Sequence, residues 1–156
     1  MATLIAILVC IGAGTIGGVF FAFSSFVMKA LAALPAPQAV SAMQSINVVV
    51  LNRVFLGVFM GTALLSLVAL VVAVASWGTR PAWLLFLAGA LYLIGSFGVT
   101  VLFNVPRNER LRAMAADSND AATYWPTYLS EWMRWNQLRT LASLASAACA
   151  AGALAL

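Results

Sequence analysis

Histidine is absent from this chain of 156 residues, and charged residues are few, at 8%. Without histidine the chain has no Ser-His-Asp or Cys-His catalysis and no His-ligated haem or zinc. A soluble domain carries about 25% charged residues, whereas 64% of this chain is hydrophobic. The composition therefore excludes a soluble enzyme, a disordered protein and a nucleic-acid-binding protein. It predicts that most of the surface faces lipid.

Cysteine is also scarce. Cys10 and Cys149 lie near opposite ends of the sequence, each inside an apolar run, and no CxxC pair exists. We interpret both as small packing residues. No clustered set of metal ligands and no nucleotide-binding loop is visible, so we expect neither a metal nor a cofactor.

Long stretches without charge locate the membrane spans. We expect four transmembrane helices, over residues of about 3–28, 54–77, 82–103 and 139–156. The first run lacks a basic start and is too long for the core of a signal peptide, so we interpret it as a retained helix. The sequence therefore predicts an all-α, integral membrane four-helix bundle that forms one domain over residues 1–156.

The segments between the spans contain prolines and capping residues. Pro35 and Pro37 break the chain, and the polar stripe after Pro37 predicts a helix that leads into the second span. We expect Pro106 to end the third span and Pro126 to open a new segment. Ser118 is a suitable N-cap for a helix that runs along the membrane interface toward the fourth span.

Lysine and arginine predict the orientation. Arg80 is alone on one side of the expected membrane. The positive-inside rule makes the other side cytoplasmic and leaves both termini outside, as in a bacterial-type inner membrane. The basic residues of the predicted cytoplasmic side are Lys29, Arg53, Arg107, Arg110, Arg112, Arg134 and Arg139.

Small residues predict where helices touch. Gly14 with Gly18, and Gly57 with Gly61, form GxxxG pairs, which allow close approach of helix backbones. Ala142, Ser146 and Ala150 give the last span a similar face. These faces indicate a compact bundle and leave open whether the chain forms a homo-oligomer.

Polar and aromatic side chains gather at the predicted cytoplasmic edge. An aromatic stripe could be an interfacial belt with snorkelling arginines. Asparagine is costly in lipid, so several at one depth must find partners or line a cavity. Glu131 is the single acid near this level, and we expect it to pair with Arg53 or Arg139, in a functional or a structural ion pair. The stripe consists of Trp125, Tyr128, Trp132, Trp135 and Arg139, and the amides are Asn47, Asn52, Asn104, Asn108 and Asn136.

Several segments resemble the anthrone-oxygenase-like family of small membrane proteins. The more specific ones are Asn104-Val105-Pro106-Arg107-Asn108 and Trp132-Met133-Arg134-Trp135-Asn136-Gln137-Leu138-Arg139-Thr140. The resemblance extends, in order, over nearly the whole chain. It departs from the family at Gln137, where a His is expected, and at Arg53, where a Pro is usual.

The resemblance implies a four-helix membrane fold and the oxidation of an anthrone methylene to a carbonyl with O₂. We therefore expect a cofactor-independent oxygenase for an anthrone-like or phenolic polycycle, with Glu131 as base. Asn104, Asn136 and Arg139 would stabilise the developing phenolate. The alternatives are a non-catalytic binder of a quinone or lipid and a structural accessory subunit. The expected substrate-binding residues are Asn47, Asn52, Arg53, Asn108, Tyr128, Trp132 and Trp135, and the expected partners are an apolar aromatic molecule, O₂ and the bilayer.

Overall fold

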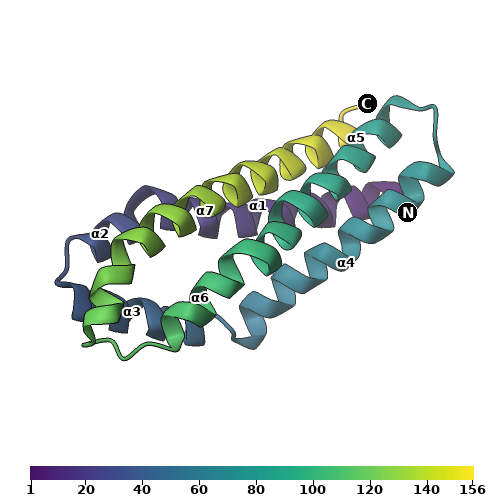
Figure 1. Ribbon diagram of the computed structural model, residues 1–156. Coiled ribbons are helices and arrows are strands. Elements are labelled where there is room, and N and C mark those ends of the chain that lie inside the picture. The colour runs from purple at the N-terminus through teal and green to yellow at the C-terminus, as the bar shows by residue number, and fades with distance from the viewer.

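The computed structural model describes residues 1–156, and nearly the whole chain is helical, as Figure 1 shows. This confirms an all-α protein. In chain order the elements are α1 (Ala2–Ala22), the π-helical segment η1 (Phe23–Val27), α2 (Met28–Ala32), α3 (Ala36–Val49), α4 (Arg53–Ala75), α5 (Arg80–Ala90), the π-helical segments η2 (Leu91–Gly98) and η3 (Thr100–Asn104), α6 (Val105–Arg112) and α7 (Asn119–Leu154).

Three continuous helices are long and apolar enough to cross a membrane: Ala2–Ala32, Arg53–Ala75 and Arg80–Arg112. They cover the first three expected spans, except that the second helix ends at Ala75 and not at residue 77, so the chain is a membrane protein. The fourth expected span is the C-terminal half of α7, a helix of 36 residues. This helix is not among the three, because its apolar half is short and its other half is polar.

Two expected helix breaks are wrong. The helix that begins with α5 continues past Pro106, and α7 continues past Pro126. Pro106 lies two residues after the π-helical segment η3, whose wider turns leave room for the proline ring. Pro126 is exposed, as is Ala122, whose carbonyl loses its helical donor and can bind water instead.

Caps define the two helix starts nearest the polar end of the molecule. Ser118 Oγ accepts from the backbone N–H of Ala121 at 3.1 Å, which confirms the helix predicted from this residue. Asn52 Oδ1 accepts from the N–H groups of Val54 and Phe55, each at 3.0 Å. Asn52 therefore begins α4 as a separate helix, and α3 does not run on into it.

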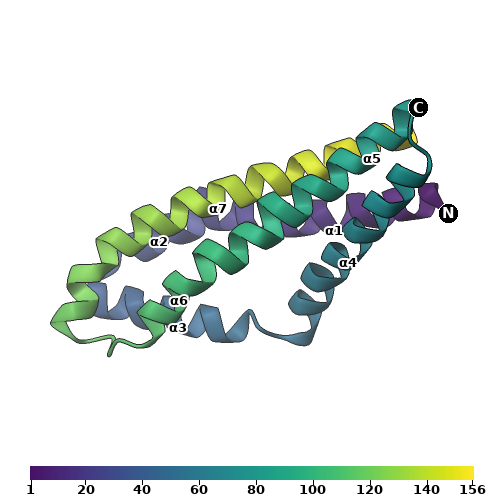
Figure 2. The same ribbon diagram turned by 45° about the vertical axis from the view of Figure 1, so that its right-hand side comes forward.

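The long helices lie side by side. α1 is antiparallel to α7, and α4 is antiparallel to α5, which also packs on α7 (Figures 1 and 2). Both termini lie at the end where α4 turns into α5. Hydroxyl groups link the helices inside the apolar part: Ser143 and Ser96 are 2.9 Å apart, and Ser146 donates to the carbonyl of Ala88 at 2.7 Å.

The two GxxxG pairs are not the contact points. A Cβ at Gly18, Gly57 or Gly61 would meet nothing within 4 Å. The close approaches are made by Gly12, Gly17, Gly89 and Gly95. A Cβ on Gly89 would lie 2.6 Å from the carbonyl oxygen of Ser66. The predicted small-residue face of the last helix is buried, at Ala142, Ser146 and Ala150.

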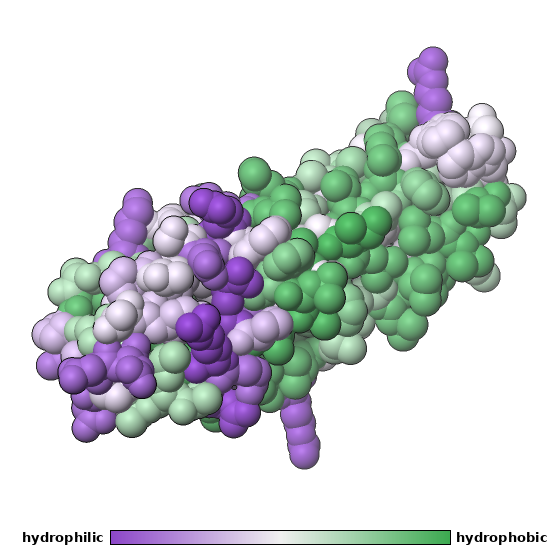
Figure 3. Space-filling model, in the orientation of Figure 1, coloured by the Kyte–Doolittle hydropathy of each residue, from purple (hydrophilic) through white to green (hydrophobic).

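The surface divides along the length of the molecule. Figure 3 shows a hydrophobic surface over most of the long helices and a hydrophilic surface gathered at the end formed by α3, α6 and the start of α7. That end has a buried core of its own, which includes Met43, Leu111, Trp125 and Tyr128. The candidate site lies where this polar end meets the apolar part.

Candidate functional site

Asn136 of α7 forms the centre of a buried polar cluster. Its side chain is fully buried. The amide nitrogen donates to the carbonyl of Phe20 and to Ser24 Oγ, both at 2.8 Å, and the amide oxygen accepts from Arg139 Nη2 at 2.6 Å. One amide thus joins α7 to the junction of α1 and η1, and it also holds the arginine one turn further along its own helix.

Arg139 is buried to 4% exposure and has no carboxylate partner. Its Nη1 donates to Thr100 Oγ1 at 3.1 Å. The guanidinium carbon lies 4.1 Å from the ring centroid of Phe20 and 5.2 Å from that of Trp132. Aromatic faces and hydroxyl groups solvate a cation only in part, so a positive charge remains in the interior without a counter-charge.

Three buried polar atoms at this end of the long helices lack a hydrogen-bond partner. They are Arg139 Nε, Asn104 Oδ1 and Asn47 Nδ2. Asn104 is buried to 1% exposure, and its amide nitrogen makes a long hydrogen bond, 3.3 Å, to the carbonyl of Trp132. An unpaired buried polar group costs about 1–3 kcal/mol. Two donors and one acceptor at this end of the long helices are therefore buried without a hydrogen-bond partner in the protein. We call Ser24, Thr100, Asn104, Asn136 and Arg139 the buried polar cluster.

Asn108 joins α6 to the aromatic stripe of α7. Its Oδ1 accepts from Tyr128 Oη and from Trp132 Nε1, both at 2.9 Å. Burial raises the pKa of Tyr128 above its ordinary value, so the phenol remains protonated and acts as donor. Because Trp132 also faces the guanidinium of Arg139, Asn108 holds one wall of the cluster in place.

Replacing Asn108 by leucine should release Trp132. We expect the tryptophan emission to shift to longer wavelength and broaden, and the free energy of unfolding to fall by about 1–3 kcal/mol, because two buried donors lose their acceptor. Asn108→Asp keeps an acceptor at this position and is the matched variant, expected to retain the parent emission. Identical emission in both variants would contradict this role for Asn108.

Four of the expected site residues belong neither to the cluster nor to the residues beside it. Asn52 is an exposed helix cap, and Arg53 is exposed at the start of α4. Trp135 stacks on Phe103 at 3.7 Å between ring centroids and is half-buried. The expected pairing of Glu131 with Arg53 or Arg139 is wrong: Glu131 Oε2 lies 2.8 Å from Arg107 Nε, and its side chain is 45% exposed.

The other expected site residues are brought together. Asn104, Asn136 and Arg139 belong to the cluster, and Asn108, Tyr128 and Trp132 form the hydrogen-bonded wall beside it. Asn47 of α3 has its amide nitrogen buried without a partner. Gln137, which replaces the His expected from the resemblance, is exposed and contributes nothing to the cluster.

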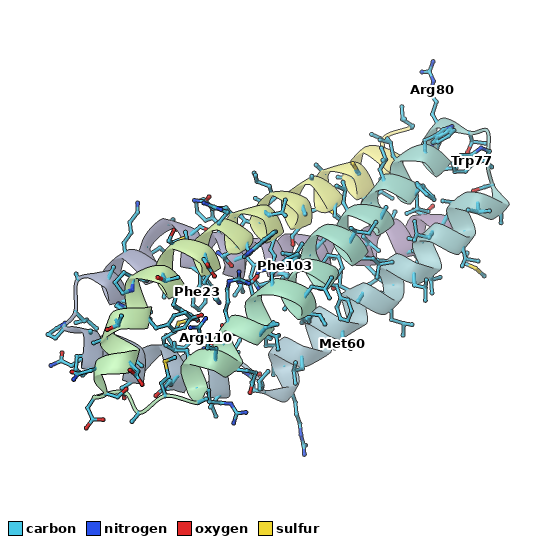
Figure 4. All side chains as sticks on the ribbon, viewed as in Figure 1. Phe23, Met60, Trp77, Arg80, Phe103 and Arg110 are labelled. Atoms are coloured by element: carbon cyan, nitrogen blue, oxygen red, sulfur yellow. The ribbon has the colours of Figure 1, made fainter.

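Phe20 and Ser24 are partners that the sequence did not predict. The available signal was Ser24 itself, a polar residue late in an otherwise apolar run. In Figure 4, Phe23 marks the segment η1, and Phe103 marks the facing segment η3. Ser24 lies in η1, while Thr100 and Asn104 lie in η3, so π-helical backbone contributes to both sides of the cluster. Such wide turns are frequent at functional sites.

The π-helical turns determine which side chains of the third long helix point inward. In a regular α-helix, the residues about seven and eleven positions after the buried Ser96 would share its face. Those residues are Phe103 and Arg107. The fully buried residue is instead Asn104, and it is Asn108 that accepts from the buried side chains of Tyr128 and Trp132. Phe103 and Arg107 contact α7 at only partly buried positions, at Trp135 and Glu131. The wide turns of η2 and η3 thus advance the inward face by one residue.

The two principal hollows lie elsewhere. One of about 360 Å³ lies at the end that holds the termini, between residues such as Thr3, Thr79 and Leu154. The other, an open hollow of about 550 Å³, lies between α3 and the loop before α7. Neither is lined by the buried polar cluster.

These observations define a class: an all-helical membrane protein with an uncompensated buried arginine and buried amides near one end of its apolar surface. The chain belongs to the anthrone oxygenase family, whose family model matches residues 51–149. The matched region includes Asn104, Asn108, Asn136 and Arg139. No curated protein and no solved structure matches this chain.

Proposed function

We propose that this protein is a membrane-embedded oxygenase that oxidises an anthrone-like or phenolic polycyclic substrate with O₂. The family match supports the reaction class. The observation that carries the proposal is the buried guanidinium of Arg139, which has no carboxylate partner and an unused Nε donor. A substrate that becomes an anion during the reaction supplies the missing negative charge.

The chemistry needs no group beyond substrate and O₂. An anthrone methylene loses a proton, and the resulting carbanion, delocalised onto the ring oxygen, gives one electron to O₂. The radical pair combines into a peroxide, which loses water and leaves a carbonyl. One O₂ is consumed and one water formed per anthrone. The protein therefore has to stabilise the anion, hold the rings and limit access of water.

Arg139 is the residue proposed to stabilise the ring oxygen, with Asn136 fixing the guanidinium through the 2.6 Å hydrogen bond. A donor held in advance in a water-poor site is worth more than the same donor in water. Asn104 Oδ1, which has no partner, would accept from a substrate hydroxyl. Trp132 offers an aromatic face beside the guanidinium.

Glu131 is a weak candidate for the base, because Arg107 already binds its carboxylate at 2.8 Å at the surface. We propose that a hydroxylated anthrone, which is acidic, loses its proton to water at the membrane interface, and that its anion then enters the water-poor site beside Arg139.

We also propose the finer architecture: one domain in which four helices span the bilayer and the polar end lies at the interface. The apolar half of α7 is antiparallel to α1, and Gly17 of α1 packs closely on Ser143 and Leu144 of α7. A helix in such close contact with a spanning helix occupies the same depth of the bilayer. Its short apolar stretch is sufficient because neighbouring helices cover its serines.

O₂ consumption with dithranol, a hydroxylated anthrone, tests the reaction. We expect the parent protein to consume about one O₂ per anthrone oxidised, faster than heat-denatured protein. Asn136→Ala should reduce turnover by about a hundredfold, since the guanidinium loses its fixed partner. Glu131→Gln, the comparison variant, should remain within a few-fold of the parent.

The alternatives give different results in the same assay. If the protein only binds the ring compound, added anthraquinone should quench its tryptophan fluorescence, and the protein should consume no O₂. An accessory subunit would show neither. A loss of turnover in Glu131→Gln with an intact fold would restore the carboxylate as base.

Orientation is a separate expectation, namely that the polar end is cytoplasmic and both termini are outside. In a variant lacking Cys10 and Cys149, a cysteine at Ser118 should react with a membrane-impermeant maleimide only after the cells are opened. A cysteine at Thr79 should react in intact cells. The reverse pattern would invert the topology.

A further inference from the structure

Four exposed cations near the polar end have no carboxylate partner, namely Arg110, which lies over the ring of Tyr124, and three that come from other helices. Lys29 belongs to α2, Arg53 begins α4 and Arg134 lies on α7, and all three side chains are exposed. The chain forms two ion pairs, Arg107 with Glu131 and Arg112 with Glu109. We call Lys29, Arg53 and Arg134 the cationic belt, because they come from three different helices.

Lys29 and Arg134 lie at nearly the same level. The hydrogen bond between Asn136 and Ser24 fixes the register of the two antiparallel helices. Arg134 is two residues from Asn136, and Lys29 is five residues from Ser24, both toward the polar end. At about 1.5 Å per residue the two positions differ by about 5 Å along the helix axes. Arg53 begins α4 at this same end of the apolar surface (Figure 1).

No acidic residue is free to neutralise the belt. Glu131, the acid nearest this level, is bound to Arg107. Asp117 and Asp120 precede or begin α7, and Asp120 is about 20 Å along the helix from Arg134. At the opposite end of the molecule Arg80 points away from the helices (Figure 4). The belt is therefore a set of positive charges without carboxylate partners at the polar end of the molecule. Figure 3 shows the boundary between this hydrophilic end and the hydrophobic surface.

We propose that the cationic belt binds the headgroups of anionic phospholipids. The aliphatic part of a lysine or arginine side chain can lie along an apolar surface while its charged group reaches the headgroup layer. A phosphodiester without a compensating amine supplies the negative charge that the protein lacks at this level. Phosphatidylcholine has the same phosphate but also a positive choline, so it satisfies the belt poorly. This inference is independent of the proposed oxidation.

The test measures which lipids remain on the purified full chain. Protein in detergent is incubated with equal amounts of phosphatidylglycerol and phosphatidylcholine, and the lipids retained are counted by native mass spectrometry. We expect the parent chain to be enriched in phosphatidylglycerol. The triple variant Lys29→Gln, Arg53→Gln, Arg134→Gln should lose this preference by about tenfold to a hundredfold, since each basic residue near anionic lipid contributes a modest increment.

A matched pair of single variants separates the belt from total charge. Arg134→Gln and Arg80→Gln each remove one exposed arginine, and only Arg134→Gln should reduce the preference, by about fivefold. Far-UV circular dichroism establishes that each variant is folded. The proposal is overturned if Arg80→Gln has the same effect, if the triple variant retains the parent preference, or if millimolar inorganic phosphate displaces the lipid.

Discussion

Replacing Arg139 by methionine should slow anthrone oxidation by about a hundredfold or more and change the unfolding temperature of the protein little. The guanidinium is buried to 4% exposure without a carboxylate partner. The free energy lost when it leaves water is therefore only partly offset by interactions within the protein. Replacing buried ionic groups with apolar residues of similar volume is often neutral or stabilising. Methionine keeps contact with the rings of Phe20 and Trp132 and removes the charge. This gain offsets the cost of about 1–3 kcal/mol that arises because Asn136 Oδ1 loses its donor.

The loss of activity has a different origin. Removal of one preorganised donor to a developing oxyanion costs about a hundredfold to a thousandfold in turnover. O₂ uptake with dithranol and thermal unfolding followed by circular dichroism, both in the same detergent, measure the two effects. Arg139→Lys keeps the charge but loses the planar fork that reaches both Thr100 and Asn136, so we expect an intermediate rate.

A stable but inactive Arg139→Met variant would mean that the arginine is retained for function at a cost in stability. A methionine variant that stays within tenfold of the parent rate would remove Arg139 from the mechanism. A variant that no longer folds would make the arginine a structural residue whose role is to join α7 to the neighbouring helix through Thr100.

Gly89→Ala should destabilise the fold strongly, whereas Gly57→Ala should not. A Cβ on Gly89 would lie 2.6 Å from the backbone oxygen of Ser66, and a backbone atom cannot rotate away. Overpacking of this kind costs about 1–3 kcal/mol. A Cβ on Gly57 meets nothing within 4 Å, and alanine is a better helix former by about 1 kcal/mol.

Thermal unfolding of both variants in one detergent tests which glycines make close helix contacts: Gly89, as the structure shows, or Gly57, as the GxxxG spacing predicts. We expect the midpoint of Gly89→Ala to fall by several degrees and that of Gly57→Ala to stay or rise. Equal losses in the two variants would indicate that the face of α4 carrying Gly57 is covered, for example by a second copy of the chain.

Much of this arrangement could be predicted from residue type alone. Charge-free runs located the first three long helices, since a charged side chain is costly in hydrocarbon. The same cost argument singled out the amides of Asn104 and Asn136, which come together with Arg139 of the aromatic stripe. Ser118 was recognisable as a cap because its hydroxyl can satisfy a free N–H at a helix start.

The relative rotation of helices could not be predicted. Glu131 was expected beside Arg53 or Arg139, but the rotation of α6 against α7 brings Arg107 to it instead. The prediction that the GxxxG pairs are helix contacts failed for a related reason. The spacing of glycines identifies a face of small residues, but it does not determine whether another helix packs on that face. The π-helical segments depend on a shift in backbone hydrogen bonding that hydropathy does not encode.

The wide turns of η2 and η3 have a consequence for comparing family members. Consider a relative in which this stretch is a regular α-helix. Its inward-facing asparagines would lie one residue closer in sequence to the position equivalent to Ser96. An ungapped alignment would then match those asparagines with Phe103 and Arg107, and the site would look unconserved. A single-residue gap placed between Ser96 and Asn104 would restore the correspondence with Asn104 and Asn108.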